Sequence, residues 1–202
     1  VRLKEPFLLI HAGQSQVHAE GTVDQLPLDE DFQKIENVWI YNREDAELTE
    51  YKVNETSGYG MVTTTLTAAQ KAAWGMDAAF ARAFNLRYPG RPLIVMKQSA
   101  YNTDVQNDAG AGDWDPANSS ELWDRFTDDV AKCRRLARKM FGGYNHAALN
   151  VVTFGEKASD NATGATNHGT NLNDFFTAWR NELSGELLVV ERLRLFESDL
   201  AT

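Results

Sequence analysis

Five short apolar runs alternate with longer amphipathic segments along this chain. These runs have the length of buried strands and cover residues 7–11, 38–41, 92–96, 148–154 and 187–193. Strands that alternate with helices are typical of a parallel sheet with helices packed on its faces. The chain has 202 residues, enough for one such domain, and no linker divides it. We therefore predict a single α/β domain, residues 1–202, built as a three-layer α/β/α sandwich.

The clearest helix is expected over residues 120–141. Its apolar side chains recur at helical spacing and would form one buried stripe, namely Leu122, Trp123, Phe126, Val130, Cys133, Leu136, Ala137 and Met140. A second helix carries Phe80 and Phe84 and ends at Pro89, and a third is expected over 173–184. The remaining segments are predicted loops: 12–37, 42–66, 97–118 and 155–172. Three of them (12–37, 97–118 and 155–172) are expected at the rim formed by the carboxyl ends of the strands, where α/β proteins place ligand sites.

The charge balance and the spacing of polar residues exclude several classes of partner. The formal net charge of −9 argues against a nucleic-acid partner, because phosphate binding needs a basic surface. No apolar run approaches the roughly 20 residues of a spanning helix, so membrane insertion is not expected. Zinc-ligand spacings and EF-hand loops are absent, so neither metal nor cofactor is expected. The single cysteine, Cys133, lies on the apolar stripe and is expected to be a packed thiol.

Ser15 lies in the tripeptide Gly13-Gln14-Ser15, directly after the first apolar run. A serine at this position can project its hydroxyl from the carboxyl edge of a parallel sheet. The backbone N–H groups of the following turn would then point at the group that the hydroxyl attacks. Small residues after a strand also serve in ordinary turns, so the tripeptide alone leaves both interpretations open.

Four sequence blocks follow one another at the ends of predicted strands or the start of a helix. They are residues 10–16 (IHAGQSQ), 74–83 (WGMDAAFARA), 94–103 (IVMKQSAYNT) and 151–156 (VVTFGE), with Asp160 close behind. This series resembles the sialate O-acetylesterase and acetylxylan-esterase-like branch of the SGNH hydrolases. That family has GQSN, GxE…FA, K.A.GGT and W.QGE.D at the corresponding places. The resemblance extends to about Leu193 and implies a flavodoxin-like SGNH hydrolase fold.

The resemblance also implies a catalytic apparatus. In that family a serine attacks an ester carbonyl, a histidine takes its proton, and N–H groups hold the oxyanion. Ser15 would then be the nucleophile, and no cofactor would be needed. The other residues that the resemblance singles out are Gln16 and Asn102 for the oxyanion, and Gln14, Gly155, Glu156 and Asp160 for the pocket.

The sequence departs from the family pattern at several places. Gln16 stands where the family has asparagine, and Tyr101-Asn102-Thr103 stands where it has GGT. Phe154 replaces an amide-bearing glutamine. The family's D-x-x-H block, which carries the catalytic histidine, has no counterpart after the last predicted strand. Either residues 1–202 stop short of the family's last strand and helix, or the chain is a family member that has lost its chemistry. In both cases we expect weak or undetectable esterase activity from residues 1–202.

Two histidines are considered as the general base for Ser15. His168 falls in the predicted polar loop 155–172, on the same rim as Ser15, and is the candidate to replace the missing base. His11 lies within the first strand, where a buried, hydrogen-bonded structural role is expected. Glu156 and Asp160 can also be interpreted as paired glycosidase carboxylates, although the esterase block or a solvated acidic loop accounts for them better.

Two functions from different classes are compatible with these residues. The first is hydrolysis of small O-acyl esters, above all acetyl groups on carbohydrate, through an acyl-Ser15 intermediate. The second is a catalytically degraded module that binds glycan or belongs to a larger extracellular or virion assembly, such as a phage tail or a cell-surface protein. The Gly-Gln-Ser and Gly-Glu blocks favour the enzyme, whereas the altered oxyanion set and the missing D-x-x-H block favour the module. The expected partners are acetylated carbohydrate, another small ester, or a protein of the assembly.

Overall fold

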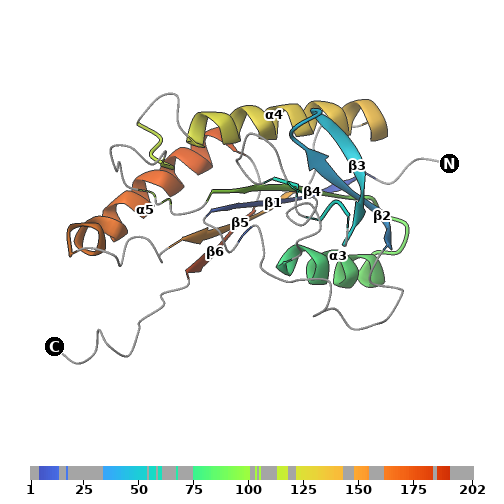
Figure 1. Ribbon diagram of the computed structural model, residues 1–202, viewed down its shortest axis with the longest axis horizontal. Coiled ribbons are helices and arrows are strands. Elements are labelled where there is room, and N and C mark those ends of the chain that lie inside the picture. Colours follow the sequence, from blue (N-terminus) through green and yellow to red (C-terminus); the bar gives the residue numbers. More distant parts are fainter. Residues whose placement is uncertain are drawn as a thin grey trace.

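The fold is a six-stranded sheet with helices on both faces, as the computed structural model shows (Figure 1). The structure describes residues 5–13, 17, 34–53, 55–57, 59–60, 67, 75–100, 103, 105, 113–117, 122–142, 148–154, 162–183 and 186–191. For residues 34, 154, 162–165 and 186–191 it describes the backbone only.

The sheet is mostly parallel and has the strand order β3-β2-β4-β1-β5-β6. Its strands are β1 (Phe7–Gly13), β2 (Lys34–Asn42), β3 (Glu47–Lys52), β4 (Leu93–Ser99), β5 (Ala148–Phe154) and β6 (Glu186–Glu191). β1 pairs in parallel with both β4 and β5, β6 continues in parallel from β5, and β2 lies parallel to β4. Only β3 is antiparallel to its neighbour among these strands. The prediction that the runs at 7–11, 92–96, 148–154 and 187–193 are parallel neighbours is confirmed.

The two central strands are buried on both faces, which explains their continuous apolar sequences. β1 begins Phe-Leu-Leu-Ile and β4 begins Leu-Ile-Val-Met, the pattern of strands covered on both sides. Successive side chains of a strand point to opposite faces. Accordingly Leu8 and Ile10 belong to one hydrophobic cluster, whereas Leu9 belongs to another across the sheet.

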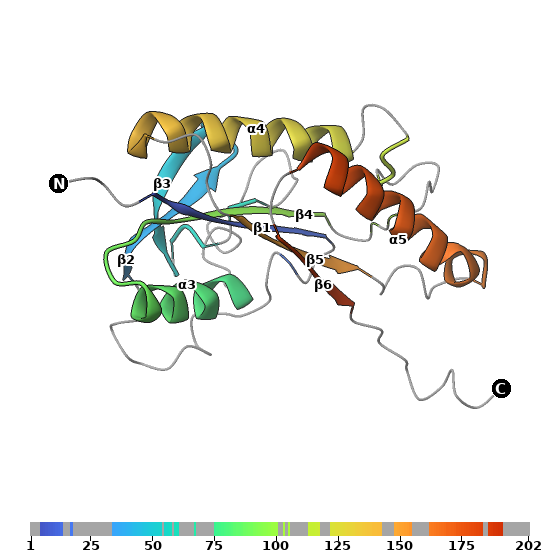
Figure 2. The same ribbon diagram turned by 180° about the vertical axis from the view of Figure 1, so that it is seen from behind.

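Three helices cover the two faces of the sheet. They are α3 (Met76–Arg87), α4 (Leu122–Phe141) and α5 (Ala162–Glu182). Figures 1 and 2 show α4 and α5 on one face and α3 on the other, so the arrangement is consistent with a flavodoxin-like sandwich. Across the residues that the structure describes, no helix combines the length and apolarity needed to cross a membrane.

Aromatic side chains form the centre of the core between α4, α5 and the sheet. Phe126 on α4 is fully buried, and its ring centroid lies 4.8 Å from that of Trp179 on α5. Trp123 lies 5.2 Å from Phe175 in an edge-to-face contact and 6.0 Å from Trp179. Contacts of this kind stabilise beyond the area that they bury. The two helices are therefore fixed to each other as well as to the sheet.

The structure corrects two predicted loops. Residues 162–172 belong to α5, which begins eleven residues before the expected helix over 173–184. Their sequence is polar and contains Gly and Thr, so it does not show the pattern of a helix. The helix is stabilised by packing at Leu172, Phe175 and Trp179 rather than by its intrinsic propensity. The predicted loop 42–66 contains β3, which forms a hairpin with β2. Asn42 closes that hairpin, because its Oδ1 accepts a hydrogen bond from the Glu44 N–H at 3.0 Å.

Phe126 tests whether the aromatic cluster carries the stability of this face. We expect Phe126→Ala to lower the free energy of unfolding by about 3–5 kcal/mol, because it leaves a cavity between α4 and α5. Met140, which was expected on the buried stripe, is instead exposed at the end of the same helix. Met140→Ala is therefore the control and should change stability by less than about 0.5 kcal/mol. Urea unfolding followed by circular dichroism measures both. Equal effects of the two substitutions would contradict this account of the core.

Candidate active site at the carboxyl edge of the sheet

The predicted site residues fall almost entirely outside the described part of the chain. This holds for the candidate nucleophile Ser15, for the oxyanion candidates Gln16 and Asn102, and for the pocket candidates Gln14, Gly155, Glu156 and Asp160. His168 is the exception. The structure does describe the strand ends from which these residues follow, and the geometry of the site is built from there.

Gly13 is the last residue of β1 and is wedged between its two neighbouring strands. It lies opposite Ser99 of β4 and Thr153 of β5. Its φ is +144°, and a Cβ atom at this position would lie 2.0 Å from the carbonyl oxygen of Thr153. Its own carbonyl accepts a hydrogen bond from the Ala100 N–H at 3.1 Å. Only glycine fits here, which accounts for the first residue of the Gly-Gln-Ser tripeptide.

The carboxyl ends of β1 and β5 flank a topological switch point. From β1 the chain goes to β2, on the β4 side of the sheet, whereas from β5 it goes to β6 on the opposite side. Connections that diverge in this way leave a crevice outside the carboxyl ends of the two strands, and α/β proteins bind ligands there. Gly13 and Phe154, which end these two strands, lie on either side of this switch point.

His168 lies in helix α5 rather than in the polar loop predicted for it. It is the seventh residue of the helix, with 9% of its surface exposed. It occupies the same helix face as Leu172 and Phe175, both of which pack in the core. The imidazole is therefore on the inward stripe of α5. Because α5 follows the carboxyl end of β5, His168 lies in the half of the helix that starts from that end.

A buried ion pair lies on the α3 face of the sheet. The Lys97 ammonium on β4 is 3.0 Å from Oδ1 of Asp77, and both side chains are almost completely inaccessible to solvent. Asp77 stands in the first turn of α3, where the helix dipole favours a negative charge. Two charges removed from water require good geometry and further hydrogen bonds to offset the loss of hydration.

Those further hydrogen bonds come from the segment around β3. The Tyr51 hydroxyl donates to the second carboxylate oxygen of Asp77 at 2.6 Å, and the Lys97 ammonium donates to the Ser57 carbonyl at 2.8 Å. Burial, followed by the nearby Asp77 carboxylate, raises the pKa of Tyr51 well above its usual value, so this hydroxyl stays a donor. Gly60 lies directly over the Lys97 backbone, and a Cβ there would be 2.3 Å from its carbonyl oxygen.

His11 lies next to this ion pair and has the structural role expected of it. Its side chain is buried, and Nε2 lies 3.3 Å from the Thr153 hydroxyl. Burial lowers the pKa of His11 to about 4; the negative charge of Asp77 opposes this shift and the positive charge of Lys97 adds to it. The imidazole is therefore neutral at pH 7. A group with so low a pKa is a weak base, so His11 is a poor candidate to activate a serine.

The ion pair was not anticipated from the sequence, although both of its members lie within the four blocks. The signal that was available is Lys97 itself, a charged residue that continues the apolar run of a central strand. Such a residue needs a buried counter-charge. Cys133, by contrast, is the packed thiol that was predicted, and burial raises its pKa to about 12. Within the described residues, no group of three metal-ligating side chains comes together.

Comparison with solved structures finds the same fold in other proteins. A protein from Arabidopsis thaliana matches with a TM-score of 0.64 and 15% sequence identity, over 97% of this chain and 90% of that one. NanS matches with a TM-score of 0.57 and 14% identity, over 91% of this chain and 63% of NanS. Similarity at this level of identity shows the fold alone. No protein-family model and no curated protein matches the sequence.

A double-mutant cycle tests the buried pair. We expect Lys97→Met to destabilise the protein by about 3–5 kcal/mol, because Asp77 is then left buried without its cation. The double variant Asp77→Asn/Lys97→Met should lose less than the sum of the two single variants. Lys132→Met is the control: it removes an exposed pair with Asp128 and a longer contact of 3.7 Å with Asp129, which keeps its pair with Arg43. It should cost at most about 1 kcal/mol. Additive single effects, or a Lys97→Met cost no larger than the control, would contradict the assignment.

The lowered pKa of His11 predicts a pH dependence of stability. Between pH 6.5 and about 4 the unfolded chain binds a proton at this residue that the folded protein does not bind. Stability should therefore fall as the pH is lowered through this window, with a contribution from His11 of up to about 3 kcal/mol. His11→Gln removes this contribution and leaves the carboxylates unchanged. Unfolding free energies of both proteins across the window measure the difference, and equal slopes would refute the prediction.

Proposed function

We propose that this protein is a serine esterase that removes acetyl groups from carbohydrate hydroxyls, with Ser15 as the nucleophile. The observation that carries the proposal is the place of Gly13 at the switch point between β1 and β5, two residues before Ser15. A serine that follows such a strand end belongs to the edge where α/β proteins hold their ligands. The Gly-Glu pair, Gly155 and Glu156, follows the other strand of the same crevice.

The chemistry requires a nucleophile, a base and oxyanion donors. The Ser15 hydroxyl would attack the carbonyl carbon of an acetyl ester while a base takes its proton, and the sugar alcohol would leave with that proton. Water would then release acetate from Ser15 by the same route. The donors proposed for the oxyanion are the Ser15 N–H together with the side-chain amides of Gln16 and Asn102. Gln14, Gly155, Glu156 and Asp160 are proposed to line the pocket.

His168 is the proposed base. His11 is made a weak base by its burial and by Lys97. His168 lies on the helix that follows the carboxyl end of β5, and this position supports its assignment as the base. Its position on the inward face of α5 also gives it contact with the core. A test of its role must therefore separate proton transfer from packing.

The substrate class rests on the motif series. The four blocks resemble those of carbohydrate O-acetylesterases, which act on an acetyl group on a sugar. The fold, which is shared with NanS, is compatible with this assignment. Phe154 removes an amide side chain, and at 101–103 the Asn102 amide has to replace the family's glycine N–H. One lost donor typically costs about 10²–10³-fold in rate. Turnover is therefore expected to be slow.

The proposal predicts an acetyl-enzyme on Ser15. Incubation with 4-nitrophenyl acetate, followed by peptide mass spectrometry, should find an acetyl group on the peptide that contains Ser15. Ser15→Ala should lose this adduct, and its rate of hydrolysis should fall to that of the uncatalysed reaction. Ser99→Ala is the control, since it removes the hydroxyl of a buried strand serine that lies outside the proposed machinery. Hydrolysis of an O-acetylated sialic acid and of an acetylated xylo-oligosaccharide then identifies the preferred sugar.

His168→Asn should slow acetylation by about 10²–10⁴-fold and change the pH dependence of the rate, if the imidazole takes the proton. A purely structural histidine would instead lower the melting temperature and leave the pH profile of the remaining activity unchanged. Absence of any Ser15-dependent adduct or hydrolysis would refute the esterase proposal as a whole.

A further inference from the structure

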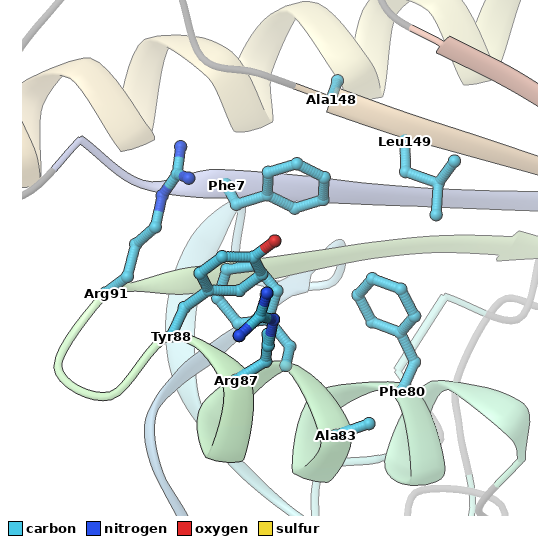
Figure 3. Close-up of a pocket in the computed structure, with 9 residues that line it drawn as sticks. Phe7, Phe80, Ala83, Arg87, Tyr88, Arg91, Ala148 and Leu149 are labelled. Carbon is cyan, nitrogen blue, oxygen red and sulfur yellow. The ribbon is translucent and has the colours of Figure 1, made fainter.

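A cavity opens at the opposite edge of the sheet from the candidate active site. It has a volume of about 430 Å³ and lies at the amino ends of β1 and β5, beside the second half of α3. This volume is within the range of about 300–1,000 Å³ that is usual for small-molecule pockets. Figure 3 shows the residues that matter for its chemistry: Phe7, Phe80, Arg87, Tyr88, Arg91 and Leu149.

The wall of this cavity is a run of aromatic rings. Phe84 is at its centre, with ring centroids 5.2 Å from Phe7, 6.2 Å from Phe80 and 5.1 Å from Tyr88. Phe7 and Phe80 are only partly buried, although both pack against the core below α3. Partly exposed rings arranged in this way offer their faces and edges to a flat apolar ligand.

Two guanidinium groups stand at one end of the aromatic wall. Arg87 lies 5.9 Å from the centroid of the Tyr88 ring, and Arg91 lies 5.6 Å from that of Phe7. The Nε of Arg91 donates to the Glu5 carbonyl at 3.0 Å, which fixes the guanidinium beside the cavity. Neither arginine pairs with a carboxylate in the part of the chain that the structure describes. Two positive charges that find no carboxylate among the described residues stand out on a chain of net charge −9.

The apolar and cationic parts of the cavity are separated along α3. Phe80 and Arg87 are seven residues apart, which corresponds to about 10 Å along the helix axis. In Figure 3, Phe80 and Leu149 lie toward one end of the cavity, and Arg87 and Arg91 toward the other. A ligand that fills this space therefore needs an apolar body and an anionic end. An arginine guanidinium can donate two parallel N–H hydrogen bonds to the two oxygens of a carboxylate.

We propose that this cavity is a binding site for aromatic carboxylates, in which a flat ring system stacks among Phe7, Phe80 and Phe84 and the carboxylate pairs with Arg87 and Arg91. The site is separate from the proposed esterase site. The two lie at opposite ends of β1, about 20 Å apart over the length of that strand. Binding here does not depend on whether Ser15 is a nucleophile.

The test uses 2-naphthoate as the probe and 2-naphthylmethanol, which lacks the charge, as its matched comparison. Calorimetric titration of the full chain should show saturable binding of 2-naphthoate. The neutral alcohol should bind at least about tenfold more weakly, because charge-assisted hydrogen bonds to a carboxylate are worth more than those to a hydroxyl. Protein NMR should place the largest ring-current shifts at Phe80, Tyr88 and Leu149.

Three variants locate the site. Ala83→Trp places a large side chain in the cavity and should abolish binding. Arg87→Gln/Arg91→Gln should weaken 2-naphthoate by about tenfold or more and leave 2-naphthylmethanol unchanged. Arg125→Gln, an exposed arginine on the opposite face, is the charge control and should have no effect. Circular dichroism and thermal unfolding verify that each variant is folded.

Several outcomes would overturn the proposal. One is equal affinity for the acid and the alcohol, which would make the cavity an unspecific apolar surface. Another is binding that survives Ala83→Trp in a folded protein, which would place the ligand elsewhere. Absence of saturable binding at millimolar concentrations would also overturn it. None of these results would bear on Ser15-dependent acetylation, so the two proposals fail separately.

Discussion

The buried ion pair between Lys97 and Asp77 is the constraint on which the α3 face of this protein depends. An ammonium and a carboxylate without access to water persist only when each finds all the polar partners that it needs. Here those partners belong to three segments of the chain. β4 supplies the cation, and the first turn of α3 supplies the anion. β3 supplies the Tyr51 hydroxyl, and the turn after it supplies the Ser57 carbonyl. The pair thus fixes the antiparallel edge hairpin and α3 to the centre of the sheet. Apolar packing would do this with less specificity, because it is non-directional.

The same cluster sets the electrostatics beneath the carboxyl edge. His11 and Lys97 are opposite each other in the register of β1 and β4, and His11 contacts Thr153 on β5. Because the imidazole is buried beside an ammonium, it remains neutral and adds no further charge to the interior. Gly13 then brings β1, β4 and β5 into close contact where the strands end. The strand ends that precede the candidate site residues are therefore held firmly in place. Catalytic groups need such support, because a small displacement of a nucleophile costs much of the rate.

The sequence predicts the parts of this fold that local pattern controls. The apolar runs of β1, β4 and β5 and the stripe of α4 give strands and a helix close to the observed bounds. β3 was missed because it is an edge strand in which only Tyr51 is buried, so it lacks an apolar run. The start of α5 was missed because its first turns are rich in Gly, Thr and Asn, and only the tertiary contacts of Leu172 and Phe175 reveal a helix. The pairing of Lys97 with Asp77 is a long-range contact that no local pattern encodes. Apart from His168, the candidate site residues lie outside the described part of the chain, so their assignment rests on the order of the sequence motifs alone.

The two proposed sites use opposite ends of one central strand, which determines how they relate to each other. Phe7 begins β1 in the aromatic cavity, and Gly13 ends it at the switch point. Coupling between distant sites needs an element with two discrete arrangements that both sites bias. β1 is hydrogen-bonded on both edges along its length, and five consecutive residues from Leu8 to Ala12 are buried, so it offers no such second arrangement. A ligand in the cavity is therefore expected to leave the geometry at Gly13 unchanged. On this argument the aromatic-carboxylate site is an independent binding site on the scaffold, and it is not a regulatory site that acts through β1 on the proposed esterase.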